Sequence, residues 1–480
     1  MFRCLLALLI SPVALISADW SWTWKPAGVA ATPQAEICPF KYGKQWAYAL
    51  EIDDGPKWAR TFAVPFLAEY GFTDAPPGVA GGKARPFVGG LAVIVNSIGA
   101  NDASVNWDDL TSMTAAGWGV LNHSLSHNGR SWGDEAGRLS DVQIAEDAFW
   151  SHALIAYGLG TGRAPTGYVY ANGYMDYNRG GVLDRLGVRI ATRVGGQTPA
   201  DVTTGEINWL DYGRSYLDEG TWVADQKSDP MSGFPVRDGD GPVNRFIIDF
   251  THVIDAKPES ANHQRWRTRL KTISESWGAK GKDNLWCAPT GEVADYLRAV
   301  RVAKVVVGHD KLTVTIPDGM PGTALTVRLS GIPEKAPLSA PPGGVLHRRG
   351  DTAWITTPLI GQAGSPAPTP NIRQVYAGPP GEIKFDKPCD VAAVAVQIGH
   401  ELPVKFSYRV SLKMVGGEKL MVEKNMPAGW FVGTNFHAIV PNAAPITAIG
   451  VTLAAQPGIK KVVVWAIDPT PAAGPKKPKH

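Results

Sequence analysis

The stretch AYALEIDDGP at residues 47–56 joins an apolar run to two adjacent carboxylates and a Gly-Pro pair. The apolar residues predict a buried strand, and Gly55-Pro56 predicts the turn that ends it. Asp53 and Asp54 therefore follow the strand and reach the rim of a sheet. Because Asp-Asp-Gly-Pro also forms ordinary solvated turns, this stretch predicts a functional site only if polar residues elsewhere in the chain accompany it.

Polar residues also follow two other predicted strands. The apolar segment 118–122 leads directly into His123-Ser-Leu-Ser-His127, and the segment 245–250 leads into Thr-His252. In parallel α/β folds the carboxyl ends of the strands lie on one face, and that face carries the site. We therefore expect the two acids and the three histidines to lie close together.

The pattern of helices and strands predicts a parallel sheet. Predicted helices at 57–70, 107–117, 139–157, 182–186, 266–277 and 292–300 alternate with predicted strands at 47–52, 91–95, 118–122, 167–173, 188–193 and 245–250. Such alternation is typical of βα units. The segment 71–86, rich in Gly, Pro and Ala, reads as an inserted loop.

The character of the chain changes near residue 302, where helical patterns end and β-like alternation begins. We expect a signal peptide at 1–18, an extended lead-in at 19–44, a catalytic domain at 45–303, a small β domain at 304–362, a Pro/Gly-rich linker at 363–380, a β-sandwich-like accessory domain at 381–469 and a disordered tail at 470–480.

Composition excludes some classes of function. Lys plus Arg minus Asp plus Glu is 47 − 44 = +3 over 480 residues, so nucleic-acid binding is not indicated. Arg3, the apolar run at 5–16 and the small residues Ser17-Ala18 predict a secretory signal that is too short to span a membrane comfortably. An uncleaved anchor is the alternative. We expect an exported protein, either secreted, periplasmic or at the cell surface, and no further transmembrane span; the oligomeric state stays open.

Four cysteines occur, and Cys4 would leave with the signal. Cys38, Cys287 and Cys389 remain, so at most one intramolecular disulfide can form. A Cys38–Cys287 disulfide fits an oxidising compartment, and buried free thiols are the alternative.

The histidine spacing indicates a metal. His123 and His127 are four residues apart, which lets both imidazoles face one side of a helical turn. On its own such a pair is more often a surface feature. With an Asp from another strand end it becomes a two-His, one-carboxylate metal site with open positions for water and substrate. A lone His252 would more often be structural, but beside such a metal site it is a candidate general acid.

These motifs resemble those of the polysaccharide deacetylases of carbohydrate esterase family 4, the NodB-homology type. Residues 51–56, EIDDGP, are similar to that family's first motif, Thr-Phe-Asp-Asp-Gly-Pro, and HSLSH at 123–127 is similar to its second, His-Ser/Thr-x-x-His. The strand ending at His252 and the segment APTGEV at 288–293 are similar to its closing elements. The resemblance covers about residues 45–303 and implies a distorted, incomplete (β/α) barrel, followed here by β-rich, sandwich-like domains.

The resemblance also implies roles for individual residues. Asp54, His123 and His127 would bind a divalent metal, usually Zn²⁺. Asp53 would be the general base that takes a proton from water, and His252 the general acid to the leaving amine or hydroxyl. The substrate would be an N- or O-acetylated polysaccharide.

The chain departs from the family at its third motif, Arg-Pro-Pro-Tyr-Gly, whose Arg contacts the catalytic base. VYANG at 169–173 stands there without an Arg. Arg163 and Arg193 are candidates to orient Asp53, with surface ion pairs as their alternative, and Asn172 and Tyr174 are candidates for base or substrate contacts. Glu51 stands where the family has Thr.

Two other functions stay open on the sequence. The missing third-motif Arg is compatible with a glycan-binding protein that keeps the fold but has weak catalysis. A metallohydrolase of a small amide is the other alternative.

Overall fold

The computed structural model describes residues 18–24, 32–99, 102–125, 127, 141–160, 163–173, 175, 181–218, 229–231, 233–235, 239–318, 320, 322–361, 372–398, 401–402, 406–426, 429–430, 433–438, 446–454, 456 and 458–467. The expected signal segment up to residue 17, the tail at 470–480 and Tyr174 lie outside these ranges.

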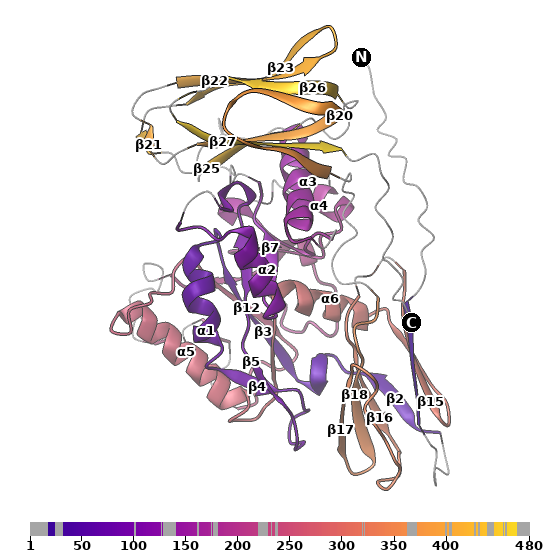
Figure 1. Ribbon diagram of the computed structural model, residues 1–480. Coiled ribbons are helices and arrows are strands. Elements are labelled where there is room, and N and C mark those ends of the chain that lie inside the picture. Colours follow the sequence, from indigo (N-terminus) through magenta and orange to yellow (C-terminus); the bar gives the residue numbers. More distant parts are fainter. Residues whose placement is uncertain are drawn as a thin grey trace. The chain divides into compact units, whose positions relative to one another are not determined.

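Residues 46–287 contain a parallel sheet (Figure 1). Its strand order is β10-β9-β8-β7-β6-β3-β12-β11, and β13 also pairs with β3. The bounds are β3 (Trp46–Ile52), β6 (Gly90–Val93), β7 (Gly119–Asn122), β8 (Gly167–Val169), β9 (Ile190–Arg193), β10 (Tyr212–Gly213), β11 (Ser215–Tyr216), β12 (Phe246–Thr251) and β13 (Leu285–Cys287). Every pairing recorded between these strands is parallel.

The two ends of this sheet are joined by a single residue. Strand β10 pairs with β9 at one end and β11 pairs with β12 at the other, yet only Arg214 separates β10 from β11 in the chain. The sheet must therefore curl until its ends nearly meet, which is the geometry of a barrel. This confirms the prediction of a distorted, incomplete (β/α) barrel.

Strand β3 lies in the middle of the sheet, and all seven of its residues are buried. A parallel strand that is covered on both faces reads as a continuous apolar run, which explains why its sequence predicted a strand without alternation. Glu51 is the charged exception on this strand, and its side chain is fully buried. A buried carboxylate needs partners, and these define part of the site below.

Helices accompany the strands. They are α1 (Val64–Leu67), which continues a π-helical turn η2 (Ala59–Ala63), α2 (Trp107–Ala115), α3 (Asp141–Gly158), α4 (Val182–Arg185), α5 (Ala261–Trp277) and α6 (Thr290–Val300). Short 3₁₀ turns are η1 (Lys41–Gly43), η3 (Val95–Ser97), η4 (Ala171–Gly173) and η6 (Trp209–Asp211). Helix α5 begins five residues before its predicted start because the Ser260 side chain caps it, accepting from the backbone N–H of His263 at 3.1 Å.

A buried ion pair fastens α5 to the barrel. Arg269 of α5 donates to both carboxylate oxygens of Asp249 on β12, from Nε at 2.7 Å and Nη2 at 3.0 Å. The Tyr48 hydroxyl of β3 donates to the same carboxylate at 2.7 Å. All three side chains are fully buried and satisfy one another, so this network is structural and separate from the site described below.

The expected lead-in and small β domain form one compact unit, built from segments within 1–45, 73–83 and 295–363. Strands β1 (Ala18–Thr23) and β2 (Gln34–Ile37) pair with β15 (Lys311–Ile316) and β16 (Thr326–Ser330), respectively. The other strands of this unit are β14 (Lys304–Val307), β17 (Val345–Arg349) and β18 (Thr352–Thr356). These pairings join residues almost 300 positions apart, so the local pattern at 19–44 could not reveal them. The two ends of the inserted segment 71–86 form a two-stranded sheet, in which β4 (Gly71–Thr73) pairs with β5 (Ala84–Pro86).

The C-terminal part is an antiparallel β structure, as predicted. Its strand order is β19-β27-β20-β26-β22-β23, and β25 pairs with β20. The bounds are β19 (Ile372–Gly378), β20 (Gly381–Ile398), β22 (Phe406–Met414), β23 (Gly417–Met426), β25 (Gly433–Ala438), β26 (Ile446–Leu453) and β27 (Ile459–Ile467), with a separate pair β21 (Glu401–Leu402) and β24 (Gly429–Trp430). Strand β19 lies within the segment expected to be a linker.

The cysteines correct one open expectation. Cys38, Cys287 and Cys389 are all free and buried, so the Cys38–Cys287 disulfide is not formed and the buried-thiol alternative holds. Burial raises the pKa of both Cys38 and Cys287 to about 12, which makes them unreactive thiols.

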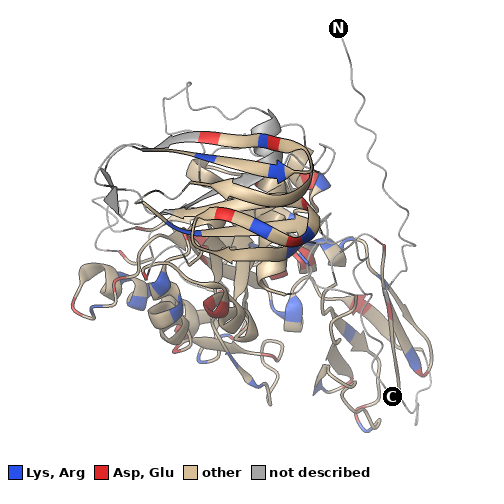
Figure 2. Cartoon of the chain, turned by 45° about the horizontal axis from the view of Figure 1, so that its top comes forward, with Lys and Arg blue, Asp and Glu red and all other residues tan. Residues whose placement is uncertain are grey.

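Two further observations concern the surface. In the part of the chain that the structure describes, no helix is long and apolar enough to cross a membrane. Figure 2 shows that basic and acidic positions are interspersed along the described chain, in keeping with the small net charge.

Candidate metal centre and acid–base site

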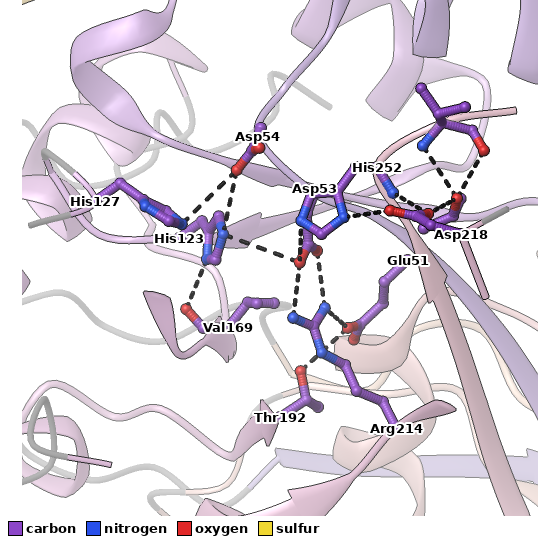
Figure 3. A network of polar contacts seen from close by, with 12 residues as sticks. Glu51, Asp53, Asp54, His123, His127, Val169, Thr192, Arg214, Asp218 and His252 are labelled. Carbon is purple, nitrogen blue, oxygen red and sulfur yellow. Dashed lines mark hydrogen bonds and ion pairs between the residues drawn. The ribbon is translucent and has the colours of Figure 1, made fainter. Parts of the chain in front are cut away.

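Three side chains converge at the carboxyl ends of two barrel strands. Asp54 follows β3, and His123 and His127 follow β7. Their ligand atoms all lie within 4.8 Å of one another, with Asp54 Oδ1 3.5 Å from His123 Nε2 and 3.8 Å from His127 Nε2. Figure 3 shows both imidazoles turned toward the Asp54 carboxylate. The sequence motifs therefore meet in space where the topology predicted.

In the segment that carries the two histidines, the described residues 123–125 and 127 do not form the helical turn that the spacing suggested. Ser124 and His127 have φ values of 70° and 56°. Side chains replace the hydrogen bonds of a helix: Asn122 Oδ1 accepts from the Ser124 N–H at 2.9 Å, and Asp147 Oδ1 accepts from the Leu125 N–H at 2.8 Å. The Ser124 hydroxyl oxygen accepts from the His127 N–H at 2.8 Å.

Both histidines are prepared to act as ligands. His123 Nδ1 lies 2.9 Å from the Val169 carbonyl oxygen of β8. An imidazole that donates from Nδ1 leaves the Nε2 lone pair free for a metal. Burial, followed by the nearby His123, lowers the pKa of His127, so His127 is neutral at neutral pH.

The two adjacent acids have different environments. Asp54 lies beyond the end of β3 with φ of 68°, in the left-handed region that Asp tolerates. Its side chain is 46% exposed, whereas that of Asp53 is 2% exposed. Burial opposes ionisation of Asp54, but the hydrogen bond and charge of His123 outweigh it and lower the pKa of Asp54 to about 2. Asp54 is thus an ionised carboxylate at the open side of the site, where it could serve as an oxygen ligand.

The donor set fits a divalent metal. Ligand atoms that lie about 2 Å from Zn²⁺ are roughly 3 Å apart from one another, and the Asp54–His123 and Asp54–His127 distances need only a small adjustment to reach that spacing. Two imidazoles and one carboxylate on one side leave other positions open. Among the described residues this is the one such cluster of possible ligands.

Asp53 is held by a guanidinium that the sequence did not single out. Arg214 donates from Nη1 to Asp53 Oδ1 at 2.8 Å and from Nη2 to Asp53 Oδ2 at 2.7 Å. Burial disfavours the charged carboxylate, but the Arg214 charge outweighs burial and lowers the pKa of Asp53. The same Oδ2 lies 4.0 Å from His123 Nε2, so the base candidate adjoins the candidate metal ligands.

Of the arginines proposed to orient Asp53, Arg193 has another carboxylate partner. The proposed contacts of Asn172 and Tyr174 with base or substrate stay predictions. Arg193, at the end of β9, donates from Nε to Asp211 Oδ1 at 2.7 Å. Arg163 lies before β8, and Asn172 is an exposed residue in η4 with φ of 53°. The guanidinium contacts on Asp53 come from Arg214 instead, whereas Tyr174 lies outside the described residues.

The third histidine has a carboxylate partner. His252, directly after β12, places Nδ1 2.8 Å from Asp218 Oδ2 and donates its backbone N–H to Asp218 Oδ1 at 2.9 Å. Its Nε2 lies 4.0 Å from Asp53 Oδ2. Burial lowers the His252 pKa, but the Asp218 hydrogen bond and the charges of Asp53 and Asp54 outweigh burial and raise it. His252 is therefore prepared to carry a proton.

Sequence reasoning missed Arg214 and Asp218 because both follow strands of only two residues. The segment around them is rich in Gly and Asp and carries no run long enough to predict a strand. The available signal was weak: Arg214 comes two positions after Tyr212, and Asp218 comes two positions after Tyr216.

Comparisons with known proteins give partial structural similarity. No protein-family model and no curated protein sequence matches this chain. A candidate polysaccharide deacetylase from Mycobacterium smegmatis aligns over 56% of this chain and 96% of its own, with 13% identity and a TM-score of 0.32. A Streptococcus pyogenes deacetylase in complex with acetate aligns over 31% of this chain with 17% identity and a TM-score of 0.24.

A polysaccharide deacetylase from Bacillus cereus also aligns over 31% of this chain, with 14% identity and a TM-score of 0.24. The present chain spans 56% of the streptococcal chain and 40% of the Bacillus cereus chain. These similarities concern folds, and the chemistry of this site rests on its own geometry.

Proposed function

We propose that this protein is a metal-dependent hydrolase that removes acetyl groups from an N- or O-acetylated polysaccharide. One observation carries the proposal: Asp53 Oδ2 lies 4.0 Å from Nε2 of the ligand candidate His123 and 4.0 Å from Nε2 of His252. A base candidate thus stands between a metal centre and an acid candidate. Hydrolysis of an amide or ester needs these three functions side by side.

Each side chain then has one task. Asp54, His123 and His127 hold the metal, and a bound divalent metal would polarise the acetyl carbonyl and lower the pKa of water. Asp53, kept ionised by Arg214, takes a proton from the attacking water. His252, whose pKa Asp218 raises, gives a proton to the leaving nitrogen or oxygen.

The Arg214 contact also bears on the binding-only alternative. That alternative arose because an Arg was missing from its expected position, and Arg214, between β10 and β11, supplies a guanidinium to the base. This favours an active hydrolase. A signal peptide at 1–18 and Zn²⁺ as the native metal are parts of the same proposal.

Metal removal tests the proposal directly. Protein treated with a chelator should release acetate from N-acetylglucosamine oligomers or acetylated xylan at the rate of the buffer blank, and one equivalent of Zn²⁺ should restore release. Asp54→Ala should weaken Zn²⁺ binding by more than about 100-fold, beyond the effect usual for supporting residues. Undiminished acetate release by fully metal-free protein would exclude the proposed chemistry.

Substrate choice separates the alternatives. Retention of glycan on the Zn²⁺-loaded protein without acetate release would establish a glycan-binding protein instead. Release of acetate from small amides alone, with none from either polymer, would establish a small-amide hydrolase.

The pH dependence should change when Asp218 is replaced. His252 acts as an acid only when protonated, and Asp218 raises its pKa. Asp218→Asn removes that support, so the His252 pKa falls. As the pH is raised, the variant should therefore lose activity at a lower pH than the native protein does. The alkaline limb of kcat/KM should move down by about 1 unit or more. A pH profile that falls in amplitude without moving this limb would contradict the role of His252 as acid.

A further inference from the structure

Glu51 is a buried carboxylate without a task in the mechanism above. It lies on β3 two residues before Asp53, so both side chains point to the same side of the strand. Its side chain is fully buried. The surrounding contacts indicate what the buried charge does, since burial without such contacts would be strongly unfavourable.

Glu51 shares one guanidinium with Asp53. Arg214 Nη1 donates to Glu51 Oε2 at 2.9 Å as well as to Asp53 Oδ1 at 2.8 Å, while Nη2 donates to Asp53 Oδ2. Figure 3 shows Arg214 between the two carboxylates. The Phe250 ring covers the guanidinium face, 3.6 Å from Cζ to the ring centre. The two acids therefore fix the guanidinium within its plane, and Phe250 limits it out of the plane.

Two hydroxyl groups hold Glu51 in turn. Thr290, the first residue of α6, donates to Glu51 Oε1 at 2.6 Å, and Thr192 of β9 donates to Oε2 at 3.1 Å. The Glu51 side chain is thus tied to three separate elements through Thr290, Thr192 and Arg214. These contacts fix the orientation of the Glu51 carboxylate. Because Arg214 bonds to both Glu51 and Asp53, Glu51 in turn helps to orient Asp53.

We propose that Glu51 is a positioning residue, which fixes Arg214 against Asp53 and so sets the direction in which the base faces the attacking water. This inference rests on the proposed function. The Glu51 carboxylate accepts hydrogen bonds from Arg214, Thr192 and Thr290, none of which is a candidate metal ligand. Its removal should therefore act on kcat and leave KM and Zn²⁺ affinity unchanged. A 1 Å displacement of a reacting group can cost about 100-fold in rate.

Two substitutions of graded severity test this role. Glu51→Leu removes every hydrogen bond and should lower kcat by about 100-fold. Glu51→Gln keeps an oxygen that accepts from Arg214 and an amide that can donate to Thr290, so it should recover most of that loss, to within about 10-fold of the native kcat. Equal losses in the two variants, or a loss in KM alone, would overturn the proposal.

Tyr48→Phe is the matched control. Tyr48 lies on the same strand and is equally buried, and its hydroxyl serves the Asp249–Arg269 pair instead of Arg214. It should lower the thermal midpoint without lowering kcat. If Glu51 served stability alone, kcat would depend only on how far each substitution lowers the thermal midpoint. Tyr48→Phe and Glu51→Gln would then have equal kcat whenever their thermal midpoints were equal.

A double substitution isolates the path through Arg214. In an Arg214→Met background, Glu51→Leu should lower kcat by less than about 3-fold further, because coupled residues give non-additive effects. Full additivity would mean that Glu51 acts independently of Arg214 and would overturn the inference.

A crystal structure of Glu51→Leu tests the positioning role of Glu51 independently of the proposed hydrolase activity. The Arg214 guanidinium should lose its paired contact with Asp53, whatever the activity of the native protein. An unchanged Arg214–Asp53 pair would refute positioning by Glu51, whereas absence of acetate release by the native protein would refute only the proposed hydrolase.

Discussion

Asp53→Asn should lower kcat for acetate release by about 100- to 10,000-fold, the range that a general base contributes. The asparagine side chain keeps the shape of Asp53 but cannot accept a proton from water. Arg214 and His252 would remain near the new amide, since both contact the present carboxylate. The measurement is acetate release from N-acetylglucosamine oligomers by Zn²⁺-loaded protein.

The neighbouring acid provides the control. Asp54→Asn should reduce Zn²⁺ affinity, measured by competition with a chromogenic chelator, while Asp53→Asn should leave that affinity close to native. The contrast follows from geometry, because Asp54 Oδ1 faces both histidines and Asp53 is held by Arg214. If Asp53→Asn kept native kcat with full metal occupancy, another residue would have to be the base.

Arg214→Met should impair both stability and rate. The substitution leaves Glu51 and Asp53, both almost fully buried, without their shared cation. Breaking a buried ion pair by removing one partner typically costs about 3–5 kcal/mol of unfolding free energy. Because Arg214 holds the pKa of Asp53 low, its loss should raise that pKa and move the acidic limb of kcat/KM to higher pH. Urea unfolding and pH profiles measure the two effects.

Arg193→Met tests whether Arg193, the candidate from the sequence, orients Asp53 in place of Arg214. Arg193 pairs with Asp211 at a partly exposed position, where an ion pair contributes about 0–1 kcal/mol. We expect Arg193→Met to change the unfolding free energy little and to release acetate at the native rate. A larger loss of rate in Arg193→Met than in Arg214→Met would restore Arg193 as the partner of the base.

Local patterns allowed much of the barrel to be predicted. Strand β3 is buried on both faces, so its continuous apolar run identified it without tertiary information. Helix α2 likewise carries its start in its own sequence, because the Asn106 and Asp109 side chains form a reciprocal capping box. An element can be predicted from the sequence when its pattern of buried residues or its capping residues lie within its own segment.

The metal centre could be located for a similar reason. Asp54, His123 and His127 each follow a strand that the sequence revealed, and parallel strands bring their carboxyl ends to one rim. The backbone that presents them was not predictable. The loop depends on Asn122 and on Asp147 of α3, which replace the hydrogen bonds of the expected helical turn.

The sequence by itself thus determined the central strand ending at Asp53 and Asp54, the barrel class and the three ligand candidates. Only the tertiary structure decided which guanidinium holds Asp53. Arg214 occupies the single residue between the two end strands of the sheet, so it approaches Glu51 and Asp53 only because the barrel nearly closes. That closure is a property of strand order around the whole barrel, and no local pattern records it.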